Sequence, residues 1–113
     1  MSYVSNLVKK PWGYEYLAYE NDEVALWFLR IRKGHKTSMH CHPNKTTGLI
    51  VLDGAAEISF LNNKFLLPSH NKIMIRKGLF HSTQAISDGG ISMFEIETPV
   101  NKNDLVRLRD SYG

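Results

Sequence analysis

Short apolar segments separated by turn residues run along most of the chain. Eight segments are rich in β-branched and aromatic residues, and none holds the 3.6-residue spacing of an amphipathic helix for long. Residues that tolerate positive φ lie between them, as at Asp53-Gly54 and Asn62-Asn63, and these favour tight turns. The pattern predicts an all-β sandwich or barrel, with strands at 14–19, 24–32, 48–52, 55–61, 64–67, 72–75, 80–86 and 91–97.

Individual segments differ in how they are expected to be buried. Ile58 and Phe60 alternate with more polar neighbours, which is typical of a half-buried strand. Residues 24–29 are apolar on both faces, so this strand is expected inside the sandwich or at a dimer contact. We expect a single domain over 1–113, with an N-terminal arm at 1–13, a charged C-terminal tail at 99–113 and a short helical turn near 103–106.

Composition narrows the class of protein. The chain has 113 residues, and its single cysteine excludes an internal disulfide and any CxxC-type zinc cluster. Fourteen Lys and Arg residues oppose eleven Asp and Glu residues and form no basic stripe, so a nucleic-acid partner is not expected. The longest apolar run, residues 25–29, is too short to span a bilayer, and the first ten residues lack a signal-peptide pattern. These features predict a cytoplasmic protein without a membrane partner.

Histidine spacing supplies the candidate chemistry. On a strand, His40 and His42 point to one face and Cys41 points to the other, so two imidazoles are placed to chelate one divalent metal ion. Cys41 is then expected to be a small core residue. The pair alone would also suit two partly exposed polar side chains, but His81 opens another β-like segment after a turn and is a candidate third ligand. The remaining histidines, His35 and His70, lie near turns and are expected at the surface.

The order of these residues resembles that of the cupins, small double-stranded β-helix or jelly-roll barrels. Six anchor positions of the two cupin motifs match in order and spacing. The resemblance implies an all-β cupin barrel in which His40, His42 and His81 hold a divalent transition metal, with zinc, nickel, manganese and iron not distinguished. The matching anchors are Gly34, His40, His42, Gly54, Gly78 and His81.

A narrower resemblance covers nearly the whole chain. Residues 10–14 (KPWGY) and 103–113 (NDLVRLRDSYG) are similar to the flanks of the C-terminal cupin domain of type II mannose-6-phosphate isomerases. This resemblance implies work on a phosphorylated or nucleotide-linked sugar in polysaccharide precursor metabolism. The chain departs from the pattern at two positions, with Pro43 in place of an arginine and Thr47 in place of a ligand glutamate. The isomerase activity as such is therefore not transferred to this chain.

Three neutral imidazoles would leave a bound metal with its full +2 charge, which favours an anionic ligand. Lys45 is a candidate to hold a phosphate or carboxylate, although a solvated loop lysine is the alternative. Thr47 is a candidate hydrogen-bond donor to substrate, and Arg76 is a candidate anion contact. Glu95 and Glu97 share one strand face and suit either a general base or replacement ligand, or a polar outer face, which we favour.

Three functions stay open at this point. The leading one is a metal-binding cupin that acts on or binds a sugar phosphate, by isomerisation or a related proton transfer. A three-histidine non-haem iron dioxygenase and a non-catalytic binding module are the alternatives, because fold analogy does not choose among them. The expected partner is a small anionic molecule. We also expect a homodimer, with the N-terminal arm (Tyr3, Trp12 and Tyr14) covering a strand edge.

Overall fold

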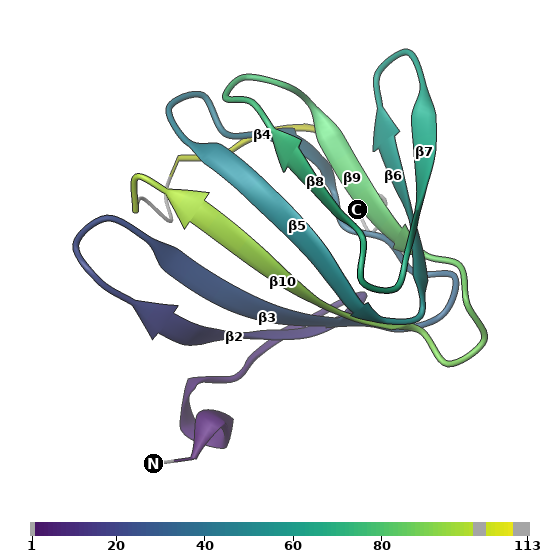
Figure 1. Ribbon diagram of the computed structural model, residues 1–113, viewed down its shortest axis with the longest axis horizontal. Coiled ribbons are helices and arrows are strands. Elements are labelled where there is room, and N and C mark those ends of the chain that lie inside the picture. The colour runs from purple at the N-terminus through teal and green to yellow at the C-terminus, as the bar shows by residue number, and fades with distance from the viewer. Residues whose placement is uncertain (1, 101–103, 110–113) are drawn as a thin grey trace.

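Two antiparallel sheets face one another and form the body of the molecule (Figure 1). The computed structural model describes residues 2–100 and 104–109. One sheet has six strands in the order β1-β2-β3-β10-β5-β8, and the other has five in the order β11-β4-β9-β6-β7. The elements are η1 (Tyr3–Asn6, a 3-10 helix), β1 (Val8–Lys10), β2 (Gly13–Glu20), β3 (Ala25–Ile31), β4 (Met39–Cys41), β5 (Thr46–Asp53), β6 (Ala55–Phe60), β7 (Lys64–Pro68), β8 (Lys72–Ile75), β9 (His81–Ala85), β10 (Ile91–Thr98) and β11 (Val106–Arg109).

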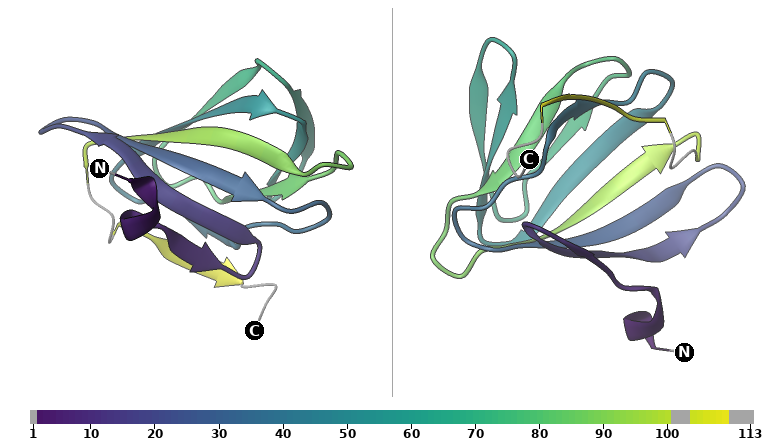
Figure 2. Two further views of the ribbon diagram at one scale, coloured as in Figure 1. Left: turned by 90° about the horizontal axis from the view of Figure 1, so that it is seen from below. Right: turned by 180° about the vertical axis from the view of Figure 1, so that it is seen from behind.

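The eight predicted strands are all present, with ends shifted by a few residues, and the all-β prediction is confirmed. The ends of the chain differ from the prediction, because the arm contributes β1 and the tail contributes β11, each as the edge strand of a sheet. Figure 2 shows β11 on the side of the molecule that is turned away in Figure 1. The helical turn expected near 103–106 lies partly outside the described residues, and Val106 begins a strand instead.

The core lies between the two sheets and is built by the inward side chains of both. Alternate residues of a strand point to one face, so each sheet supplies one row of apolar side chains. Ile31, Val51 and Ile58 are fully enclosed, as predicted for Ile58. The buried apolar cluster comprises Trp12, Leu29, Ile31, Leu49, Val51, Ala56, Ile58, Leu67, Ile75, Ala85, Ile91 and Met93.

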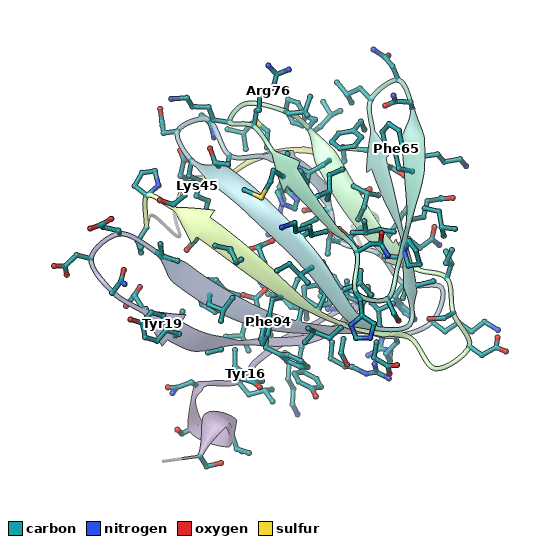
Figure 3. The ribbon with its side chains drawn as sticks, in the orientation of Figure 1. Tyr16, Tyr19, Lys45, Phe65, Arg76 and Phe94 are labelled. Carbon is teal, nitrogen blue, oxygen red and sulfur yellow. The ribbon has the colours of Figure 1, made fainter. Side chains whose placement is uncertain are left out.

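The outer face of the six-stranded sheet carries a row of aromatic side chains. Phe28 of β3 stacks on Tyr16 with ring centroids 5.0 Å apart and meets Phe94 of β10 edge-on at 6.2 Å. Tyr14 lies 6.3 Å from the same ring. Figure 3 shows Tyr16 and Phe94 along this side of the molecule. The apolar residues on both faces of β3 therefore divide between the core and this aromatic row.

A tight turn joins β5 to β6 and depends on a glycine. Gly54 has φ +91°, and a Cβ there would lie 2.3 Å from the carbonyl oxygen of Gly90. Only glycine combines this backbone conformation with so close an approach. The turn brings β6 beside β9, whose first residue is His81.

Candidate metal centre

Three histidines from two separate segments meet inside the five-stranded sheet. His40 lies on β4, His42 follows that strand directly, and His81 opens β9, where it pairs in register with His40. Their ring centroids are 4.6 Å (His40–His81), 4.9 Å (His40–His42) and 5.6 Å (His42–His81) apart. One ring nitrogen from each lies within 4.8 Å of the others. The structure therefore brings His81 to the His40/His42 pair, which the sequence alone did not show.

The hydrogen bonds of the three rings prepare them for a metal ion. Each Nδ1 donates to a backbone carbonyl: His40 to Ser38 at 2.7 Å, His42 to Asp104 at 2.8 Å and His81 to Leu79 at 2.9 Å. The proton on Nδ1 leaves the lone pair on Nε2, which is the second-shell arrangement usual for metal-binding histidines. Within the described residues, the Nε2 atoms of His42 and His81 are buried and have no hydrogen-bond partner. Buried polar atoms without partners are costly, and a metal ion would satisfy them.

Burial keeps the three imidazoles neutral. The pKa of His40 is lowered to about 3, mainly by desolvation and in part by the neighbouring His81. Desolvation also lowers the pKa of His81 to about 4. The pKa of His42 is lowered for the same reason, and the carbonyl of Asp104 partly opposes the shift. Neutral imidazole is the form that binds a metal, so the ligands are ready at neutral pH without losing a proton.

The other candidate ligands lie outside this cluster. Cys41 is buried and belongs to the strand position between the two histidines, and the group of three ligand atoms does not include it. His70 is exposed with φ 67°, and His35 is half-buried, so neither joins the site.

No helix in the described ranges 2–100 and 104–109 has the length and apolar character to cross a membrane.

A buried ion pair adjoins the histidines. The Lys45 ammonium contacts the Glu97 carboxylate, and both side chains are 2% exposed. The Nε1 of Trp27 donates to the other carboxylate oxygen of Glu97 at 3.3 Å. The prediction that Glu95 and Glu97 form a polar outer face is therefore wrong. Glu97 is buried on the inner face, and Glu95 lines the cavity described next.

A cavity of about 320 Å³ opens beside the histidines. It is lined by both basic and acidic side chains, and Lys10 lies 3.9 Å from Glu15 at its wall. Basic groups from three separate segments face this cavity, and the carboxylates of Glu15 and Glu95 line it as well. The charged and metal-ligating side chains around it include Lys10, Glu15, His40, His42, Lys45 and Arg107.

The three predicted substrate contacts are not brought together. Lys45 lines the cavity with His40 and His42. Thr47 is 1% exposed and is the Cα partner of Glu97, but it does not line the cavity. Arg76 is exposed at the rim of the molecule, in a separate hollow formed with the 76–79 loop (Figure 3). The substrate roles of Thr47 and Arg76 stay predictions.

Sequence reasoning missed part of this wall. Arg107 comes from β11, which was taken for a charged tail, and its alternation of apolar and basic residues was a signal for an edge strand. Asp104 is also part of the site, since its carboxylate accepts from the backbone N–H of Asn44 at 2.8 Å and from Asn44 Nδ2 at 2.9 Å. No local pattern connects residues this far apart in the chain.

Comparison with known proteins identifies the family. The model of the mannose-6-phosphate isomerase C-terminal family matches residues 2–110. The chain belongs to this family. This domain is similar to part of the mannose-1-phosphate guanylyltransferase of Klebsiella pneumoniae, with 21% identity over 108 residues that cover 94% of this chain and 23% of the relative. It is 24% identical over 112 residues to the xanthan biosynthesis protein XanB of Xanthomonas campestris pv. campestris (strain B100), with the same coverage.

The fold is likewise that of the cupin double-stranded β-helix. A conserved protein of Klebsiella pneumoniae with a double-stranded β-helix domain superimposes with a TM-score of 0.76 at 14% identity, over 90% of this chain and 79% of the other. The cupin resemblance seen in the sequence is thus confirmed. This domain spans less than a quarter of the curated relatives' length. The activities of those whole proteins are therefore considered for this chain only as proposals.

Proposed function

We propose that this domain binds a divalent transition metal through His40, His42 and His81 and acts on a phosphorylated or nucleotide-linked sugar. The observation that carries the proposal is the common hydrogen-bond pattern, in which each Nδ1 donates to a backbone carbonyl and each Nε2 is left for a ligand. A bound metal would polarise a carbonyl or hydroxyl of the ligand. Sugar phosphates are supported as ligands by the family and by the names of the relatives.

The cavity supports the same ligand class. Lys10 and Arg107 approach it from β1 and from β11, so they are placed to hold a phosphate. Lys45, from the segment before β5, adds its positive charge to the same wall while it is paired with Glu97. Glu95 lines the same cavity and is proposed as the group that moves a proton between neighbouring carbons of the sugar. Such an isomerisation takes a proton from one carbon and returns it to the next, so that no atom is gained or lost.

A three-histidine iron dioxygenase is the second candidate. It is favoured by the ligand cluster itself, in which three histidines meet without a carboxylate. A non-catalytic binding module is the third, and the substitutions at Pro43 and Thr47 favour it. Elemental analysis together with oxygen-uptake measurements distinguishes the first two, because the dioxygenase requires iron and consumes oxygen in the presence of its ligand.

Metal content and ligand stabilisation test the leading proposal. Replacing both His40 and His42 by Ala is expected to abolish metal uptake, with His70→Asn as the matched control that leaves it unchanged. Metal content equal to wild type in the double variant would refute the site. A panel of sugar phosphates and nucleotide sugars is expected to raise the melting temperature of the metal-loaded protein, and no shift with any member would remove the sugar proposal.

We also infer a homodimer and a cytoplasmic location. The aromatic row of Tyr14, Tyr16, Phe28 and Phe94 on the outer sheet face supports pairing, because a second copy would remove it from water. Sedimentation equilibrium at micromolar concentration is expected to give twice the chain mass, and a monomer would refute the pairing. Cell fractionation tests the location.

A further inference from the structure

The buried Lys45–Glu97 ion pair has no explanation in the fold itself. Both side chains are 2% exposed, and Trp27 donates to the second oxygen of the same carboxylate. Moving two charges out of water costs several kcal/mol each, and apolar side chains at such positions are often at least as stable. A buried pair of this kind beside a cluster of metal-ligating side chains is a candidate for a functional role.

Its position relates the pair directly to the histidines. Lys45 lies three residues after His42 and lines the cavity that His40 and His42 also line. Glu97 is the Cα partner of Thr47 across the β10–β5 ladder, so a carboxylate reaches the interior here from β10 rather than from β5. The Glu97 carboxylate is not among the ligand atoms that lie within 4.8 Å of one another, so in this structure it stands apart from the three-histidine cluster.

A divalent cation at the three histidines would attract Glu97 and repel Lys45. Three neutral imidazoles leave the +2 charge uncompensated, and carboxylate oxygens join histidines in many metal sites. We propose that Glu97 is a latent ligand of this metal centre, and that Lys45 holds it away so that a position on the metal stays open for an anionic substrate. This inference rests on the proposed metal binding. Glu97 is thus a candidate metal ligand, and Lys45 is a positioning residue.

A double-mutant cycle on metal affinity tests the proposal. Apoprotein is titrated with Co²⁺, whose absorption spectrum reports the ligand set, for wild type, Lys45→Met, Glu97→Gln and the double variant. Lys45→Met releases the carboxylate, so Co²⁺ is expected to bind at least 10-fold more tightly and with a changed spectrum. Glu97→Gln is then expected to cost about 10-fold more affinity in the Lys45→Met background than in wild type.

The control is Lys10→Met, which removes the same charge from the same cavity but does not release Glu97. In that background, Glu97→Gln is expected to cost no more than in wild type. The proposal is overturned if Glu97→Gln costs the same Co²⁺ affinity in wild type, in Lys45→Met and in Lys10→Met and the Co²⁺ spectrum does not change. The pair would then act on the metal only through its charges.

Two further measurements keep the test decisive. Lys45→Met leaves a buried carboxylate without its cation and is liable to unfold, so Lys45→Gln, which still donates a hydrogen bond, is measured in parallel. It is expected to show the same coupling with Glu97→Gln at a smaller size, and additive effects there would also overturn the proposal. If wild-type protein takes up no Co²⁺, the proposed function fails. If wild type binds Co²⁺ but shows no coupling, only the latent ligand fails.

Discussion

Acidification is expected to destabilise the metal-free protein in a defined pH window. Burial holds the pKa of His40 at about 3 and that of His81 at about 4, whereas both titrate near 6.5 in the unfolded chain. Above pH 6.5 both states are neutral, and the stability is fully present. Between pH 6.5 and about 4, only the unfolded chain takes up protons, so stability falls as the pH falls. At pH 5 each histidine lowers the free energy of unfolding by about 2 kcal/mol, and the two together lower it by about 4 kcal/mol.

That loss is large for a domain whose total stability is of the order of 5–15 kcal/mol. Urea unfolding at pH 7.5 and pH 5, after treatment with a chelator, measures it directly. Replacing both His40 and His81 by Asn is expected to remove most of the difference between the two pH values. His70→Asn is the control, because that side chain is exposed and Asn also suits its positive φ. The reasoning is wrong if the double variant keeps the pH dependence of wild type.

Four other substitutions test the turns, the loop and the strand around the site. Gly54→Ala is expected to cost at least about 2 kcal/mol in urea unfolding, because its Cβ would lie 2.3 Å from a backbone oxygen, whereas Gly78→Ala meets open space and is expected to cost about 1 kcal/mol. Equal costs would refute the steric argument. Asp104→Ala releases the bonds from Asn44 and is expected to weaken Zn²⁺ affinity about 10-fold in a chelator competition, and an unchanged affinity would show that this loop does not position the site. Cys41→Ala is expected to leave Zn²⁺ affinity unchanged, and a large loss would make Cys41 a ligand.

The sequence was most informative where its pattern had one interpretation. Period-two alternation located β6 closely, and the turn residues on either side of residues 72–75 located β8. The His40/His42 spacing was informative for a similar reason, since residues two apart on a strand share a face whichever way the strand points.

The rest depended on information that one strand does not carry. In β10, Met93 and Phe94 are both apolar, so alternation does not say which face is the core. Taking the Phe94 face as the interior placed Glu97 outside, whereas Phe94 belongs to the outer aromatic row and Glu97 is enclosed. The contact between Lys45 and Glu97 is a tertiary one with no local signal.

The arrangement of the metal ligands also bears on how the sheet is held together. In the described part of the chain, β4 meets β9 at a single pair in strand register, His40 with His81, whereas β6 and β9 share five. A metal bound by these histidines would strengthen the least extensive strand pairing of the five-stranded sheet at that point. The bound metal would then link β4 to β9. Removing the metal would let β4 and the neighbouring edge strand β11 exchange their amide hydrogens faster than the rest of the sheet.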